Sequence, residues 1–222
     1  MLNYRRLVVS NIDDKNINRL YKELLQNRYQ FIILYLDKIK YILTKERSLF
    51  EITNEDEFLN NAENDIYYKT IITTKNSNVN ENDLNIYKYY LEKYIDKMNK
   101  KQYDDKYYFG CVAVKSNKGF ITTIRGKENF DEYTIVENVN HKNHTIKVIN
   151  KKASLNAPLL DYLFKNQKVK SIVHLHDFCD KLPYYEYAFP GTVKDSIRNN
   201  HTSFNIKYHG VIYLFDKNGH IL

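Results

Sequence analysis

The stretch SIVHLHDF, residues 171–178, places two histidines two positions apart at the end of an apolar run. The run is typical of a buried β-strand, in which residues i and i+2 point to the same face of the sheet. His174 and His176 are therefore expected to present their imidazole rings side by side, as two ligands of one metal ion do. An H-x-H pair alone is weak support, because so short a motif often arises by chance.

A metal site of this type requires at least a third protein ligand, and His209 is the best candidate. It lies in FNIKYHGVIYLFD, which we interpret as one further apolar strand, beside Gly210, where another backbone can approach closely. The other histidines suit the role less well. They lie in polar turns that are expected to be solvated, or close to the last residue: His141, His144, His201 and His220.

The composition indicates a globular protein without a membrane span. The 222 residues are 43% hydrophobic, which is sufficient for a sizeable core. The longest clean apolar run, FIILYL, is too short to cross a bilayer, and the first residues show no signal-peptide pattern. The two cysteines, Cys111 and Cys179, do not make a disulfide framework. We therefore expect a cytoplasmic protein with no membrane partner.

The formal net charge of +7 and the pI of about 9.1 raise the question of a nucleic-acid partner. The lysines are spread along the chain and are not gathered into a basic segment. Nucleic-acid binding therefore has only the net charge in its favour, and we do not expect it.

Glycine and proline divide the chain, since all of them lie beyond residue 109. These residue types mark tight turns and special backbone angles. We expect an N-terminal α/β extension of unknown role over residues 1–79 and a second domain over residues 80–222, with the polar stretch KNSNVNEND between them.

Local patterns predict the elements of both parts. In the extension, Asp13 and Asp14 are suited to cap a helix, and FIILYL and DIYYKTIITT are expected to be strands. In the second domain, a helix over residues 82–100 carries one apolar stripe and is expected to pack on the core. The sequence that follows is rich in predicted strands: YYFGCVAVKS, GFITTI, YTIVENVN and TIKVIN.

Six short motifs follow one another in the second domain. In order, the chain reads FGCVAVK, GFITTIRG, KKASLNAPLLDYLF, SIVHLHDF, YAFPGT and YHGVI. Over roughly residues 80–215 this series resembles the class II aldolase and adducin head family. Its members carry G-N-x-S-x-R, T-P-x-G, P-S-S/T-E, H-x-H, P-G-T and a late H-G in the same order. No single motif is specific, and the resemblance rests on their order.

The resemblance implies an α/β fold, namely an α/β/α sandwich around a mainly antiparallel sheet. It also implies a divalent cation, usually zinc, held by His174, His176 and His209, and a homo-oligomeric assembly. Family enzymes act on small phosphorylated sugars as lyases, epimerases or dehydratases, and the metal polarises a carbonyl group. By motif, the residues expected to bind such a substrate are Gly110, Thr123, Gly126, Ser154 and Asn156.

Several positions depart from the family pattern. Cys111 and Ala113 replace polar residues of the first motif, and Asn156 replaces the glutamate that acts as acid and base in the aldolases. An amide does not exchange a proton at neutral pH. Glu186, between the H-x-H and P-G-T motifs, is the candidate catalytic substitute, although a surface carboxylate is the simpler interpretation.

Two functions therefore remain open. The first is a zinc-dependent enzyme acting on a sugar phosphate, which the three histidines favour. The second is a catalytically inactive module of the aldolase fold that serves binding or assembly. Asn156 favours this second function, as does the chain ending soon after His209, where family members carry further helices.

Overall fold

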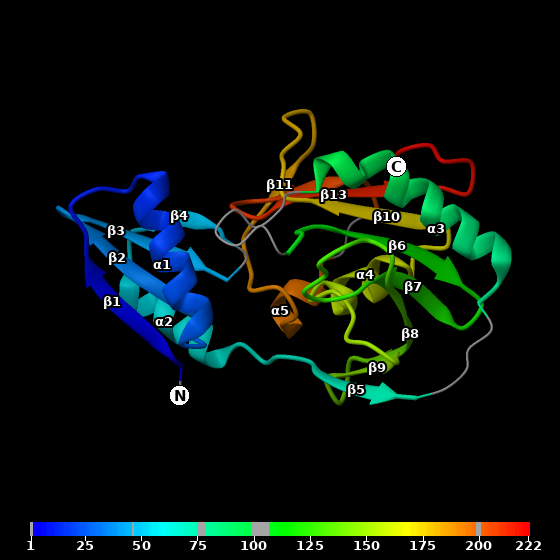
Figure 1. Cartoon of the computed structure of the whole chain (residues 1–222), viewed down its shortest axis with the longest axis horizontal. Coiled ribbons are helices and arrows are strands. Elements are labelled where there is room, and N and C mark those ends of the chain that lie inside the picture. Colours follow the sequence, from blue (N-terminus) through cyan, green and yellow to red (C-terminus); the bar gives the residue numbers. More distant parts are fainter. Residues whose placement is uncertain (1, 46, 75–78, 99–106, 199–200) are drawn as a thin grey trace. The chain divides into compact units, whose positions relative to one another are not determined.

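The computed structural model describes residues 2–45, 47–74, 79–98, 107–198 and 201–222 (Figure 1). The chain is a mixed α/β protein with two sheets, and it divides into two compact units. The described residues up to Asp65 form the first unit, and those from Ile66 onward form the second, apart from the undescribed stretch near residue 100. The division lies earlier than the boundary expected after residue 79, because strand β5 pairs with a strand of the second unit.

The first unit is a four-stranded sheet with two helices. Its strands lie in the order β1-β2-β3-β4, with β1 parallel to β2 and the remaining pairs antiparallel. As expected, Asp13 caps the first helix, since its side chain accepts a hydrogen bond from the backbone N–H of Asn16 at 2.7 Å. The elements are β1 (Tyr4–Val8), α1 (Asp14–Gln26), β2 (Phe31–Leu36), β3 (Ile39–Thr44), β4 (Leu49–Ile52) and α2 (Glu55–Asn64).

The second unit is built on a nine-stranded sheet in the order β11-β12-β13-β10-β6-β7-β8-β9-β5. The sheet is mainly antiparallel, as expected, with parallel pairs only at its two ends, β11 with β12 and β5 with β9. Its strands are β5 (Lys69–Thr73), β6 (Cys111–Ser116), β7 (Gly119–Thr123), β8 (Tyr133–Asn140), β9 (Thr145–Ile149), β10 (Ser171–Leu175), β11 (Tyr184–Tyr185), β12 (Phe204–Ile206) and β13 (Gly210–Phe215).

Helices cover the two faces of this sheet (Figure 1). Alternate residues of each central strand point to opposite faces, so that Ala113 packs with the leucines of one helix and Val112 with the tyrosines of another. Because both faces are covered, β10 is buried at every position and β6 at its first four positions. The helices are α3 (Glu81–Tyr94, followed by a 3₁₀ turn over Ile95–Lys97), α4 (Ala157–Leu163) and α5 (Val193–Ser196).

Strands β10 and β13 lie side by side at the centre of the sheet, with His174 opposite Ile212. The expected single strand over FNIKYHGVIYLFD is wrong in one respect, because it forms two strands that turn at Tyr208, which has a φ of 60°. His209 therefore ends a turn and does not lie within a strand. Gly210 has a φ of 142°, and a Cβ there would lie 2.0 Å from the carbonyl oxygen of Leu175. Only glycine fits this close approach.

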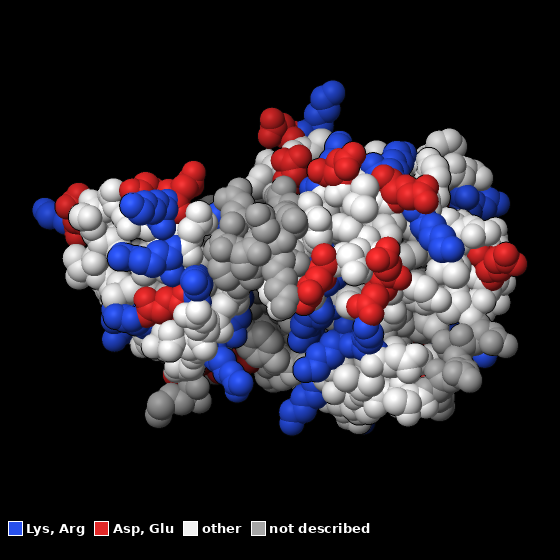
Figure 2. Space-filling model, viewed as in Figure 1, with Lys and Arg blue, Asp and Glu red and all other residues white. Residues whose placement is uncertain are grey.

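Charged side chains of both signs occur on the visible face of each unit (Figure 2). Despite the net charge of +7, that face therefore carries both positive and negative side chains and is not uniformly basic. Within the described residues, no helix combines the length and apolar character required to cross a membrane.

Candidate metal centre

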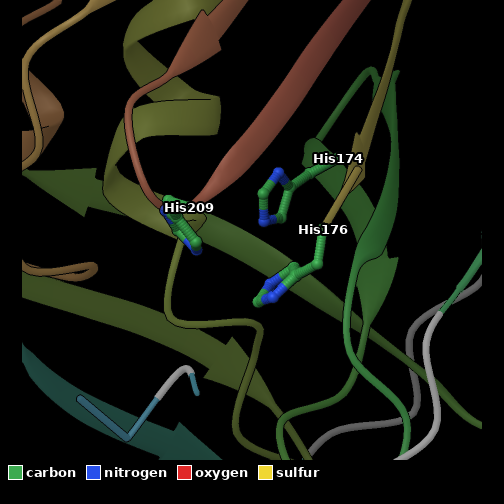
Figure 3. A group of neighbouring side chains, drawn as sticks. All are labelled: His174, His176 and His209. Atoms are coloured by element: carbon green, nitrogen blue, oxygen red, sulfur yellow. The ribbon is translucent and has the colours of Figure 1, made fainter. Parts of the chain in front are cut away.

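Three histidine rings, on or directly beside the neighbouring strands β10 and β13, converge at one end of the sheet (Figure 3). His174 lies on β10, His176 follows the last residue of that strand, and His209 directly precedes β13. One ring nitrogen from each residue lies within 4.8 Å of the other two. The ring centroids are 4.6 to 5.0 Å apart. This group can hold a metal ion, as the spacing of the histidines predicts.

A hydrogen bond fixes the tautomer of His174. Its Nδ1 lies 3.1 Å from the carbonyl oxygen of Val211 on β13. A carbonyl oxygen can only accept, so Nδ1 carries the hydrogen and Nε2 keeps its lone pair. That Nε2 atom is buried and has no hydrogen-bond partner among the described residues. A ligating histidine is commonly held in this way, with one nitrogen on a carbonyl group and the other on the metal.

His209 presents a second buried nitrogen. Its Nδ1 has no hydrogen-bond partner within the described part of the chain, and only 4% of the residue is exposed. A buried polar atom without a partner is costly, and a bound cation would remove that cost. The residues present therefore fit a metal ion on two independent counts, the convergence of the rings and the unsatisfied nitrogens.

Burial keeps the rings in the form that binds metal. It lowers the pKa of His174 to about 4, and it lowers the pKa of His209 well below its ordinary value, with further lowering from the neighbouring His174 and His176. Both rings are therefore neutral at pH 7. A neutral imidazole has the free lone pair that coordination requires.

The segment before β6 supports the centre from one side. The ring of Phe109 stacks on His176 with a centroid distance of 4.6 Å and an interplanar angle of 22°. The next residue, Gly110, has a φ of 79°, and a Cβ there would lie 2.7 Å from the carbonyl oxygen of His174. Gly110 thus has a packing role that the motif comparison did not anticipate. From the other side, the ring of Tyr187 lies 6.3 Å from that of His209.

Two of the expected substrate-binding residues, Ser154 and Asn156, lie on the face of the sheet that carries His174. Their position follows from their contacts with Cys111. Cys111 is the direct partner of His174 in the pairing of β6 with β10, so their side chains share a face. Burial raises the pKa of the Cys111 thiol, and contacts with Ser154 and Asn156 act in the opposite direction. Ser154 and Asn156 therefore lie within hydrogen-bonding reach of the Cys111 thiol. The Oδ1 atom of Asn156 is buried without a hydrogen-bond partner among the described residues.

Thr123 and Gly126 are placed differently. Thr123 pairs with Tyr133, whose ring contacts Tyr87 of α3, so the Thr123 side chain points to the α3 face and away from the face of His174. Its carbonyl oxygen, and not its side chain, contacts another of the expected substrate-binding residues, since it accepts a hydrogen bond from Ser154 N at 3.2 Å. Gly126 is exposed, with a φ of 64°, and the nearest atom to a Cβ there would be on the Tyr107 ring, 4.0 Å away. Contact of either residue with a substrate stays a prediction.

Glu186, the candidate acid and base, has an exposed carboxylate. Its side chain is 81% accessible and forms an ion pair with Lys207. Its carbonyl oxygen accepts a hydrogen bond from the Arg198 guanidinium at 2.7 Å. The catalytic role of Glu186 stays a prediction, and an acid–base step would require its carboxylate to leave Lys207.

Two sets of side chains have surroundings that the sequence did not predict. The expectation that His141 is solvated is wrong, because its Nδ1 lies 2.6 Å from the Tyr68 hydroxyl and its Nε2 2.9 Å from Asp161 Oδ2. The polar residues around it in the sequence gave no sign of these distant partners. The second is Lys127, which is only 4% exposed and donates a hydrogen bond to the carbonyl oxygen of Gly110 at 2.6 Å.

Neither protein-family models nor curated proteins give a match to this chain.

Proposed function

We propose that this protein binds one zinc ion through His174, His176 and His209 and acts on a small sugar phosphate as a lyase, epimerase or dehydratase. The observation that carries the proposal is the pair of buried, unpartnered nitrogens on His174 and His209 within a group of three converging rings. The aldolase-like fold is part of the same proposal. It is supported by the mainly antiparallel sheet and by the pairing of β10 with β13, the strands on or beside which the histidines lie.

The donor set favours zinc over magnesium or calcium. Three imidazole nitrogens suit zinc, whereas magnesium and calcium prefer oxygen ligands. Three protein ligands also leave one position for a substrate or water, which is typical of catalytic zinc sites and not of structural ones. When bound, such an ion polarises a carbonyl or hydroxyl oxygen of the substrate.

Other groups of the chain orient the histidine rings and are placed to bind the substrate. The Val211 carbonyl fixes the ring of His174, and Phe109 fixes the ring of His176 by stacking. Ser154 and Asn156 supply a hydroxyl and an amide on the same face, where they can hydrogen-bond substrate oxygens. Asn156 cannot transfer a proton, so the proposal assigns proton transfer to Glu186 and expects no aldol cleavage of the family type.

The alternative is a binding module of the same fold that has no catalysis. It is favoured by two observations: Asn156 occupies the position expected for the acid and base, and the Glu186 carboxylate is exposed and paired with Lys207. Under this alternative the centre still binds metal and ligand, but the ligand leaves unchanged.

Metal analysis of the purified protein tests the proposal. We expect about one equivalent of zinc in the wild type and its loss in His176→Ala. His220→Ala is the matched control, because that side chain is 78% exposed and lies outside the three-histidine group. A wild type that takes up no zinc after dialysis against it would refute the proposal. Zinc binding without turnover of any small ketose or aldose phosphate would favour the binding module.

A further inference from the structure

A buried amide on β12 holds the segment that follows His176. Asn205 is fully buried, and its side chain makes three hydrogen bonds with that segment. Its Oδ1 accepts from the backbone N–H of Cys179 at 3.0 Å, and its Nδ2 donates to the carbonyl oxygens of Cys179 at 2.8 Å and Leu182 at 3.1 Å. Because a backbone N–H only donates and a carbonyl only accepts, these partners fix the orientation of the amide.

The amide takes the place of strand pairing in a part of the chain that has left the sheet. Strand β10 ends at Leu175, and Cys179 lies between that strand and β11. The Asn205 side chain offers Cys179 one acceptor and one donor, as the backbone of a neighbouring strand does. A further hydrogen bond, from Leu182 N to the Cys179 carbonyl oxygen at 2.9 Å, closes the turn. The backbone three residues after His176 is therefore held on β12 by a side chain.

Strand β12 also contacts the segments of the other two histidines. Asn205 pairs with Val211 in the sheet, and the Val211 carbonyl accepts the hydrogen bond from His174 Nδ1. The carbonyl oxygen of Ile206, the next residue on β12, accepts a hydrogen bond from the backbone N–H of His209 at 3.1 Å. One short strand thus joins the backbone around all three histidines. Its link to the remaining segment runs through the Asn205 side chain, so that a substitution can remove this link without breaking the strand pairing.

We propose that Asn205 is a positioning residue of the three-histidine centre, which fixes the place of His176 relative to the other two rings. His176 lies just beyond the paired part of β10 and is less buried than the other two histidines. Its position therefore depends on the segment that follows, which Asn205 holds. Phe204 and Ile206 pack on the face of His174, so the amide between them points to the opposite face and acts on the centre through the backbone. The inference rests on the proposed function for the bound ion.

Metal-free protein tests the positioning role separately from the ion. Asn205→Leu keeps the size of the side chain and removes its hydrogen bonds. We expect the NMR signals of the His176 ring to shift and broaden, and the Cys179 amide to exchange with deuterium roughly 10-fold faster, as is typical for the loss of one hydrogen bond. The Nδ1–H of His174 is expected to remain protected from exchange, because its bond to the Val211 carbonyl stays.

Ser203→Ala is the matched control. Ser203 directly precedes β12 and is also fully buried, and its hydroxyl accepts a hydrogen bond from Leu214 N at 2.9 Å, at the end of β13 remote from His209. The variant therefore removes a buried hydrogen bond beside the same strand without touching the segment that follows His176. We expect a lower melting temperature with unchanged signals of the His176 ring and unchanged zinc affinity.

Zinc titration in competition with a chromophoric chelator measures the consequence for the centre. We expect Asn205→Leu to bind zinc roughly 10-fold more weakly than the wild type, as is typical for the loss of a residue that orients a metal ligand. Asn205→Asp keeps the acceptor for Cys179 N but loses both donors, so we expect at least the same loss. The absorption spectrum of cobalt-loaded Asn205→Leu, recorded at saturation, is expected to differ from that of the wild type, because the ligand geometry differs.

A purely structural role for Asn205 predicts different results. It predicts a lower melting temperature, with the His176 signals, the zinc affinity and the cobalt spectrum of the folded protein unchanged, and this outcome would overturn the inference. If Asn205→Leu does not fold, Asn205→Ser takes its place in these measurements. A Cys179 amide that exchanges as fast as an exposed loop amide in the metal-free wild type would likewise overturn the inference. A wild type that takes up no zinc, with the His176 signals displaced in Asn205→Leu, would refute the proposed function and support this inference.

Discussion

The Nδ1–H of His174 donates to the carbonyl oxygen of Val211 over a distance of 3.1 Å, and this bond ties one histidine of the candidate centre, on β10, to the strand that follows His209. The geometry of the centre is therefore set by how closely β13 lies against β10. The closest backbone contact between the two strands occurs at Gly210, where a Cβ would lie 2.0 Å from the carbonyl oxygen of Leu175.

Gly210→Ala is expected to move His209 away from the other two ligands and to lower the free energy of unfolding by about 2–3 kcal/mol, because β13 must shift to avoid the clash. Denaturant unfolding and zinc titration measure both effects. Gly126→Ala is the control: its φ of 64° is also left-handed, but the nearest atom to its Cβ would be 4.0 Å away. There we expect a loss of about 1–2 kcal/mol with zinc binding intact. Equal zinc affinity in wild type and Gly210→Ala would contradict the prediction.

The stability of the metal-free protein is expected to depend on pH through His174. Its pKa falls from 6.5 to about 4 on folding, so between these values the unfolded chain binds more protons than the folded one. Stability is therefore fully present above pH 6.5 and decreases as the pH falls toward about 4. Unfolding curves between pH 7.5 and pH 4.5 measure this, and His174→Gln is expected to reduce the dependence to the part that His209 contributes. A metal-free protein that gains stability on acidification would show that the ring is protonated in the folded state.

His141→Ala is expected to lower the free energy of unfolding by about 1–3 kcal/mol, because it removes the hydrogen bonds to Tyr68 and Asp161 and leaves the buried Tyr68 hydroxyl with only its contact to Ser196. Zinc content is expected to stay at that of the wild type, since His141 lies outside the three-histidine group. Thermal unfolding and metal analysis on the same sample check both parts. His201→Ala is the control, because that side chain is exposed. Loss of zinc from His141→Ala would refute the assignment of the ligands.

Asn156→Glu tests whether the centre lacks only an acid and base. We expect no appreciable aldol cleavage of ketose 1-phosphates by the wild type and measurable cleavage by Asn156→Glu, because general acid–base catalysis contributes about 10² to 10⁴-fold. Glutamine has the same size as glutamate but lacks the carboxylate, so Asn156→Gln is expected to stay inactive. A coupled assay for the released aldehyde distinguishes them. Robust cleavage by the wild type would mean that another group transfers the proton, and Glu186→Gln would then identify or exclude Glu186.

Local sequence patterns predicted most strands of the second unit, because apolar runs bounded by turn residues are informative without knowledge of their partners. The hairpin of β2 and β3 was missed, since its turn contains no glycine. Asp37 adopts a φ of 53° instead, a conformation that aspartate tolerates. The stretch that forms β5 was recognised as a strand but assigned to the wrong unit. Its partner, β9, is distant in the sequence, and no local pattern encodes that pairing.

The histidines of the centre could be predicted because the two-residue spacing and the glycine beside His209 each have a geometric meaning. Lys127 could not, because a lysine in a polar segment is usually solvated, and its burial depends on contact with Gly110. The motif comparison also could not predict the direction in which the Thr123 side chain points. It follows from the register of β7 with β8, which only the folded sheet defines.

The pairing of β13 with β10 also has a kinetic consequence. His174 and His209 are separated along the chain by β11, α5 and β12, so the three nitrogens converge only after this long connection has closed. Contacts between distant residues form late in folding. If the centre binds a metal ion as proposed, the ion binds only after this connection has closed, and it then links the two segments that carry the histidines. Its release then requires either a histidine to swing away or the sheet to open between β10 and β13, so that the rate of exchange depends on these motions as well as on affinity.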